Sequence, residues 1–195
     1  MRKTVFVITT VASVITALLL SCNIAAEKNE ASSIISKDSL IKRGAYVVTI
    51  SGCDDCHSPK KMGPRGPELD MDRRLSGFPS GRPMPQFDSN LVKKGIAMLN
   101  EDLTSAAGPW GVSFAANLTS DATGIGSWTE ENFTRALRKG KFKGQENGRG
   151  LLPPMPWQNY AQMSDEDIKA VFAFLQSTKP VENVVPAARQ LADLK

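Results

Sequence analysis

The sequence of 195 residues contains one histidine and three cysteines, and these low numbers exclude several kinds of site. One histidine cannot supply a metal centre that needs several imidazoles. The formal net charge is only +4, two units of which come from Arg2 and Lys3, so the balance does not indicate a nucleic-acid partner. The one long apolar run, Val5 to Leu20, is shorter than the about twenty residues that a membrane-spanning helix needs.

The start of the chain has the composition of an export signal. Met1-Arg2-Lys3 is basic, the apolar run follows, and Leu19-Leu20-Ser21-Cys22 ends it. These last four residues resemble a bacterial lipoprotein signal, in which Cys22 is lipidated and becomes the first residue of the mature protein. An ordinary secretory signal cleaved near Ala25-Ala26 is the alternative. We predict a signal peptide over 1–21, a lipid anchor at Cys22, and an exported lipoprotein held at a membrane surface and facing the periplasm.

The rest of the chain divides by composition into a tether, one domain and a short end. Residues 22–36 are mostly small and polar and have no sustained period, which is typical of a flexible tether. Residues 37–182 have the length of a single domain and contain no internal repeat. We interpret residues 183–195 as a C-terminal tail.

Cys53-Asp54-Asp55-Cys56-His57 is the most informative segment of the chain. Cys-x-x-Cys-His is the attachment sequence of a c-type haem: the two thiols bond to the haem vinyl groups, and the histidine binds the iron. A zinc knuckle and a thioredoxin-like redox pair are the alternatives, but the first lacks a fourth ligand at similar spacing and the second lacks a strand-helix-strand context. Because the motif occurs once, we predict one covalent haem c.

The sixth position on the iron needs a ligand other than histidine, or stays open, because His57 is the only histidine. Methionine in this position is typical of electron carriers. Met155 lies in Pro153-Pro154-Met155-Pro156-Trp157, where prolines restrict the backbone and apolar neighbours such as Trp157 would exclude water. We predict Met155 as the axial ligand, with Met163 as the second candidate. A gap-filling core methionine is the plain alternative for Met155.

Three helices are predicted from apolar periodicity and end signals. The first leads from about Leu40 into the haem motif, the second covers 129–140, and the last covers 164–179. Ser164 is a typical N-cap for the last helix, and Gly140 a typical C-cap for the second. The expected fold class is therefore mainly α.

The segment between the haem motif and residue 127 is a long irregular insertion. Glycine and proline are frequent from Pro59 to Pro85, and helical periodicity is absent. One weak signal predicts a small β-hairpin, in which 95–100 pairs with 110–117 across Gly108-Pro109.

With these features, the chain resembles the class I cytochrome c family from about residue 38 to 182. It is most similar to the cytochrome c domains of bacterial membrane-bound dehydrogenase subunits. The resemblance implies that the first and last helices cross beside the haem, with Gly44 at the crossing and Phe172 and Phe174 opposite. It also implies that the carbonyl of Pro67 accepts a hydrogen bond from His57, for which a simple turn is the alternative. Besides the haem motif, the matching segments are Arg43-Gly44-Ala45-Tyr46, Gly66-Pro67-Glu68-Leu69, Asn117-Leu118-Thr119-Ser120-Asp121, Gly124-Ile125-Gly126-Ser127-Trp128-Thr129, Ala136-Leu137-Arg138 and Pro153-Pro154-Met155-Pro156-Trp157.

The leading hypothesis is a one-electron carrier that is not an enzyme by itself. It would pass electrons from a membrane or periplasmic dehydrogenase to an oxidase or another cytochrome. Two alternatives stay open: a haem with an open or displaceable sixth site that binds a gas or peroxide, and a cytochrome subunit of a larger dehydrogenase complex. A basic cluster could steer an acidic redox partner, although an ordinary solvated surface is the simpler interpretation. The cluster comprises Lys139, Lys141, Lys143 and Arg149.

Overall fold

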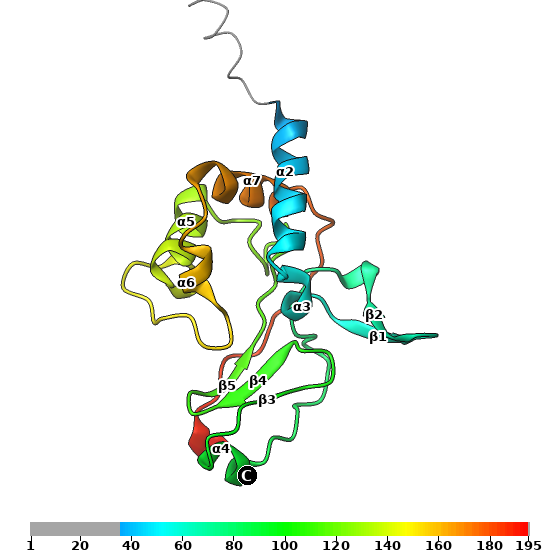
Figure 1. Cartoon of the computed structure of the whole chain (residues 1–195), viewed down its shortest axis with the longest axis vertical. Coiled ribbons are helices and arrows are strands. Elements are labelled where there is room, and N and C mark those ends of the chain that lie inside the picture. The colour runs from blue at the N-terminus through cyan, green and yellow to red at the C-terminus, as the bar shows by residue number, and fades with distance from the viewer. Residues whose placement is uncertain (1–35, 195) are drawn as a thin grey trace, which may run out of the picture. The chain divides into compact units, whose positions relative to one another are not determined.

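The structure is a computed structural model that describes residues 36–194. The predicted signal peptide, the predicted lipidation site Cys22 and residues 23–35 of the predicted tether lie outside the described residues. Within 36–194, no helix has both the length and the apolar character needed to cross a membrane. The elements follow one another along the chain as Figure 1 shows.

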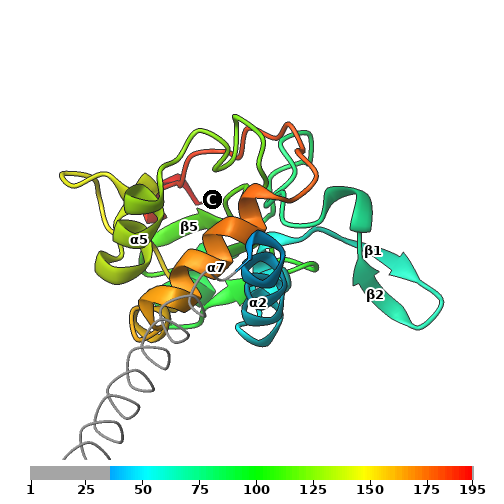
Figure 2. The same cartoon turned by 90° about the horizontal axis from the view of Figure 1, so that it is seen from above.

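Helices α2 (Lys37–Ile50) and α7 (Asp165–Gln176) cross in close contact, which Figure 2 shows from above. Gly44 allows the close approach, because a Cβ atom at this position would lie 2.0 Å from the carbonyl oxygen of Ala170 and 2.7 Å from Cβ of Phe174. At the surface, Arg43 Nε donates to Asp167 Oδ1 at 2.7 Å. The predicted approach of the first and last helices at Gly44 is therefore present.

Helix α5 (Glu130–Lys139) has the predicted ends. Thr129 and Asn132 form a capping box at its start, and Gly140 ends it with a φ of 59°, a conformation that favours glycine. Ser164 caps α7 in a similar way, since its side chain accepts from the backbone N–H of Asp167. The signals for both ends of α5 and for the start of α7 are confirmed, whereas α7 ends at Gln176 and not at 179 as predicted.

The main hydrophobic core joins α2, α5 and α7. The rings of Phe133 in α5 and Phe172 in α7 lie with their centres 5.4 Å apart. Two residues of the connecting segments, Leu75 and Ile125, are almost completely buried in the same cluster. The buried members are Val47, Val48, Leu75, Ile125, Phe133, Leu137, Ile168, Val171 and Leu175.

Two small antiparallel sheets make the fold mixed, which corrects the expectation of a mainly α protein. Strands β1 (Lys60–Gly63) and β2 (Gly66–Leu69) form a hairpin that projects from the domain in Figures 1 and 2. The second sheet has the order β3 (Met98–Leu99), β4 (Ser105–Gly108), β5 (Gly111–Phe114). A turn at Gly108-Pro109 does connect two strands, but the partner of β5 is β4 and not 95–100. These strands have two to four residues, too few for a clear alternating pattern.

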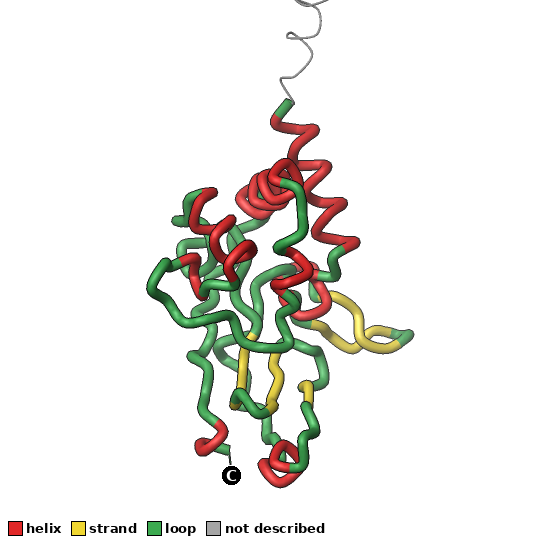
Figure 3. The backbone as a smooth tube through the Cα atoms, turned by 60° about the vertical axis from the view of Figure 1, so that its left-hand side comes forward, coloured by secondary structure: helices red, strands yellow, loops and turns green. Residues whose placement is uncertain are grey.

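The insertion has a second, smaller core, and the end of the described chain packs against it. Phe87, Val92 of α4 (Ser89–Lys93), Ala107 and Val112 form this core. Leu191 and Leu194 pack on it from the segment that we predicted as a tail. Arg189 and Val112 exchange two backbone hydrogen bonds of 2.9 Å. Up to residue 194 this segment is thus part of the domain, and Figure 3 shows it beside the second sheet.

Candidate haem site

The Cys-x-x-Cys-His segment folds as a helix of about one turn, α3 (Cys53–His57), directly after α2. Gly52 connects the two helices with a φ of 66°. Cys53 and Cys56 are three positions apart and therefore lie on one face of α3. Both are free thiols and partly exposed. Two accessible thiols on one helical face match the requirement for bonding to two vinyl groups.

One hydrogen bond orients the ring of His57. Its Nδ1 atom lies 2.8 Å from the carbonyl oxygen of Ala116, which is 59 residues further along the chain. Because a carbonyl can only accept, Nδ1 carries the proton and Nε2 keeps the lone pair that would bind iron. Burial lowers the pKa of His57, although the bond to Ala116 and the charge of Asp54 oppose this shift. The imidazole is therefore neutral at neutral pH, as a metal ligand has to be.

Ala116 has the role that we predicted for Pro67. Pro67 is an exposed residue of strand β2 in the projecting hairpin, so its carbonyl is not the acceptor for His57. The backbone of His57 is held as well, because its carbonyl accepts from the N–H of Gly77 at 2.7 Å. A backbone acceptor has no side-chain signature. The nearest signal in the sequence is the matching segment that begins at Asn117, one residue after the true acceptor.

Asp54 anchors α3 to the segment that follows it. Its Oδ2 accepts from Arg74 Nη2 at 2.7 Å, and its Oδ1 accepts from Ser58 Oγ at 2.6 Å. Burial alone would raise the pKa of Asp54, but the hydrogen bonds from Arg74 and Ser58 together lower it. The guanidinium of Arg74 also lies 5.7 Å from the ring centre of Phe174 in α7. The side chain of Arg74 thus connects the haem motif with the helix crossing, through an ion pair with Asp54 and a contact with the ring of Phe174.

The two thiols lack the properties of a reactive redox pair. Burial raises the pKa of Cys53 to about 11. It raises the pKa of Cys56 as well, although the charge of Lys60 opposes the shift. Redox-active Cys-x-x-Cys motifs have lowered thiol pKa values, so this environment disfavours the thioredoxin-like alternative. Across residues 36–194, no group of three or more His, Cys, Asp and Glu side chains is placed to hold a metal ion.

Met155 precedes the short helix α6 (Trp157–Tyr160), in a loop that is tied down at several points. Ser113 Oγ of β5 donates to the carbonyl of Pro153 at 2.6 Å, and the N–H of Trp157 donates to the carbonyl of Met155 at 2.9 Å. The ring of Trp157 packs over Gly140, where a Cβ atom would lie 2.4 Å from ring atom Cε2. The backbone at Met155 is thus held from both sides.

One of the two attachment cysteines and both candidate methionine ligands pack against the main hydrophobic core. Cys53, Met155 and Met163 are all partly buried and pack against the main core. Tyr160 joins them, and its hydroxyl donates to the carbonyl of Ser51 at 2.8 Å, beside the start of α3. Other partly buried members are Leu118, Trp128, Phe172 and Phe174. These apolar side chains are only partly buried, so each of them still offers surface to a flat apolar group.

The curated relatives of this chain are cytochrome c subunits of dehydrogenases. The chain is 33% identical over 148 residues to the gluconate 2-dehydrogenase cytochrome c subunit of Pantoea cypripedii, a match of 75% of this chain and 25% of that protein. It is 34% identical over 146 residues to the cytochrome c subunit of alcohol dehydrogenase (quinone) from Gluconobacter oxydans (strain 621H), which is 74% of this chain and 23% of that protein. These similarities support membership of the cytochrome c family.

A third cytochrome relative is the fructose dehydrogenase cytochrome subunit of Gluconobacter japonicus, 28% identical over 171 residues, or 87% of this chain and 28% of that protein. The chain thus spans about a quarter of the length of these relatives. No family model matches it. The relatives are cytochrome subunits of dehydrogenases, which agrees with an electron-transfer role and with a cytochrome that is not an enzyme by itself.

The residues of this cytochrome c relative fit a haem c. Cys53 and Cys56 would hold it covalently, and His57 offers a neutral Nε2 in a fixed orientation. Met155 and Met163 both offer a soft thioether in the same cluster. This donor set matches a c-type haem with two thioether bonds and with histidine and methionine ligands.

Proposed function

We propose that this chain carries one electron at a time on a single covalent haem c, as the cytochrome part of a membrane or periplasmic dehydrogenase system. The observation that carries the proposal is the orientation of His57 by Ala116, directly after Cys53 and Cys56 on one helical turn. When bound, the haem supplies an Fe(III)/Fe(II) couple. The relatives named as dehydrogenase cytochrome subunits support this role. The electron would pass to an oxidase or to another cytochrome.

The proposal includes Met155 as the second axial ligand. A thioether in this position raises the reduction potential, which suits an electron carrier. Support comes from the loop, since Ser113 and Trp157 restrict the backbone on either side of Met155. A ligand held in this way keeps one geometry in both redox states, so little has to rearrange on electron transfer. Trp157 would help to exclude water from the sulfur.

The decisive test is the visible spectrum of the full-length, haem-loaded protein, oxidised and reduced, with and without carbon monoxide. We expect a c-type spectrum, a methionine-to-iron charge-transfer band, and no response to carbon monoxide. Met155→Ala should remove the band and allow carbon monoxide to bind, while the matched variant Met163→Ala should keep the wild-type spectrum. The reverse result would assign the ligand to Met163. A protein without covalent haem refutes the electron carrier.

We also propose that the chain is exported and anchored at Cys22 by lipid, facing the periplasm. The support is the basic start followed by an apolar run and Leu19-Leu20-Ser21-Cys22. Cys22→Ser should move the haem protein from the membrane fraction to the soluble periplasmic fraction without changing its spectrum. If the variant stays in the membrane fraction, the anchor is not a lipid on Cys22.

A further inference from the structure

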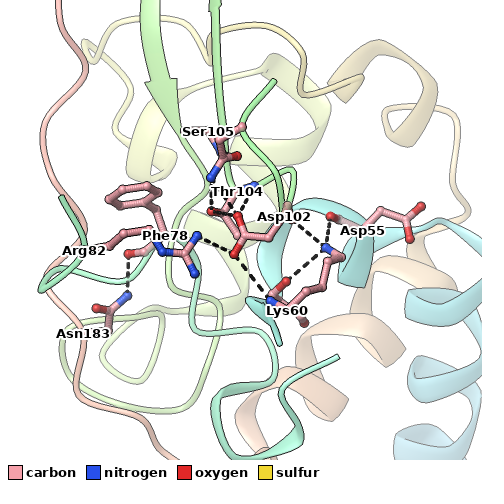
Figure 4. A network of polar contacts seen from close by, with 10 residues as sticks. Asp55, Lys60, Phe78, Arg82, Asp102, Thr104, Ser105 and Asn183 are labelled. Atoms are coloured by element: carbon pink, nitrogen blue, oxygen red, sulfur yellow. Dashed lines mark hydrogen bonds and ion pairs between the residues drawn. The ribbon is translucent and has the colours of Figure 1, made fainter. Parts of the chain in front are cut away.

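Three backbone carbonyls hold the ammonium of Lys60 against the haem-binding helix. Lys60 Nζ donates to the carbonyl oxygens of Asp55 at 2.5 Å, Ser58 at 3.1 Å and Asp102 at 2.8 Å. Figure 4 shows the contacts with Asp55 and Asp102. An ammonium has three N–H donors, so all of them are used. Asp55 and Ser58 lie on either side of His57 in sequence, and the positive charge is therefore fixed beside the backbone of the axial ligand.

Asp102, a residue of the insertion, accepts from Lys60 with its backbone carbonyl and forms an ion pair with a second cation, Arg82. Only 2% of Asp102 is exposed. Its Oδ2 accepts from Arg82 Nη1 at 2.6 Å, and its Oδ1 accepts from Thr104 Oγ1 at 2.6 Å (Figure 4). Burial alone would raise the pKa of Asp102, but hydrogen bonds from Thr104 and Arg82 together lower it. The carboxylate is therefore ionised, and the network of Lys60, Arg82 and Asp102 has a net charge of +1.

We propose that Lys60, positioned by Asp102, raises the reduction potential of this cytochrome. Reduction transfers one electron from the donor protein to the iron, Fe(III) becoming Fe(II), and no bond forms or breaks. A fixed positive charge stabilises the site after it has gained this electron. The effect is stronger for a charge held in a partly buried network than for one in water. The inference rests on the proposed function, because it needs a haem attached at α3.

The next residue of β1 supplies a matched control. The side chain of Lys61 is 62% exposed, and its nearest acid is Asp70, with Nζ 3.9 Å from Oδ1. Successive residues of a strand point to opposite faces, so Lys60 and Lys61 place the same charge in different surroundings. Lys60→Met and Lys61→Met remove the same charge and leave side chains of the same kind. A difference between these variants therefore reports on position and not on net charge.

The experiment is a redox titration of the full-length, haem-loaded protein and its variants. We expect Lys60→Met to lower the equilibrium constant for reduction at least threefold, which is about 28 mV for a one-electron couple at about 59 mV per tenfold. Lys61→Met should shift the reduction potential by less than half of that amount. Lys60→Arg keeps the charge and should restore most of the potential. Asp102→Asn removes the negative charge of the network but keeps the backbone carbonyl that accepts from Lys60 Nζ, so it should raise the potential.

Two results would overturn the inference: equal shifts in Lys60→Met and Lys61→Met, or a fall of the potential in Asp102→Asn. The charge-transfer band checks that each variant keeps its axial ligand. If Lys60→Met does not retain haem, Lys60→Gln replaces it in the comparison. The inference then requires that Lys60→Gln lowers the reduction potential and that Asp102→Asn raises it. Wild-type protein without covalent haem would refute the proposed function. A c-type spectrum with a potential insensitive to Lys60 refutes this inference alone.

Discussion

Replacing Gly44 by alanine should push apart the two helices at the centre of the fold. The added Cβ atom would lie 2.0 Å from the carbonyl oxygen of Ala170, 2.6 Å from its carbonyl carbon and 2.7 Å from Cβ of Phe174. Favourable contacts between heavy atoms lie near 3.5–4.0 Å, so all three are far too short. Two of these atoms belong to the backbone of α7. No side-chain rotation can therefore relieve the clash, and the helices themselves have to move.

The expected loss of stability follows from two opposing terms. Alanine stabilises a helix interior by about 1 kcal/mol relative to glycine. Extra atoms in a well-packed region cost about 1–3 kcal/mol, and a clash with rigid backbone falls at the upper end of this range. Gly44→Ala should therefore lower the free energy of unfolding by about 2 kcal/mol. For a domain of this length, that is a decrease in Tm of about 4–8 °C.

Thermal unfolding of the full-length, haem-loaded protein, followed by far-ultraviolet circular dichroism, measures this effect. Gly81→Ala is the matched control, because a Cβ atom at Gly81 has no atom within 4 Å and the backbone φ there is not left-handed. This variant should stay within about 1 kcal/mol of wild type, on the stabilising side. A Gly44→Ala protein that melts at or above the wild-type temperature would refute the close crossing of α2 and α7.

Three further predictions concern contacts that hold the domain and the site. Asn183→Ala should lower the free energy of unfolding by about 2–4 kcal/mol in chemical denaturation, because the carbonyls of Ser76 and Phe78 lose a buried donor. Ser113→Ala removes the 2.6 Å bond to Pro153 and should destabilise the Met155 loop by about 1 kcal/mol, seen as loss of the charge-transfer band at a lower temperature. The hydrogen bond from Arg43 lowers the pKa of Asp167 in the folded state below the unfolded value near 3.9, so its stabilising contribution is complete at neutral pH and is lost as the pH falls below about 4. Asp167→Asn should therefore make acid unfolding less steep, and an unchanged acid transition would contradict this reasoning.

Features that depend on neighbouring residues could be predicted from the sequence. The caps of α5 and α7 are local, because Thr129, Gly140 and Ser164 act within a few residues of themselves. The haem motif is local in the same sense. The hairpin of β1 and β2 was missed because its four-residue strands lie among glycines and prolines that usually indicate loops.

Contacts between distant segments could not be predicted in this way. The acceptor for His57 is a backbone carbonyl 59 residues away, so no residue type marks it. Lys60 and Asp102 are 42 residues apart, and nothing in their spacing connects them. One signal was available for Asp102, since its Oδ1 accepts from the N–H of Thr104 in a turn that aspartate commonly forms. That signal indicates a turn, but it does not indicate which helix the turn contacts.

Residues of the second sheet and of its flanking segments make three contacts with the candidate site. Ala116 orients the ring of His57, the carbonyl of Asp102 holds Lys60 beside α3, and Ser113 ties the loop that carries Met155. All three contacts come from residues 102–116, within the segment that the sequence indicated as an irregular insertion with one small hairpin. A movement of this segment would therefore disturb both His57 and the loop that carries Met155. The insertion is therefore part of the frame that would set the geometry of the proposed ligands His57 and Met155.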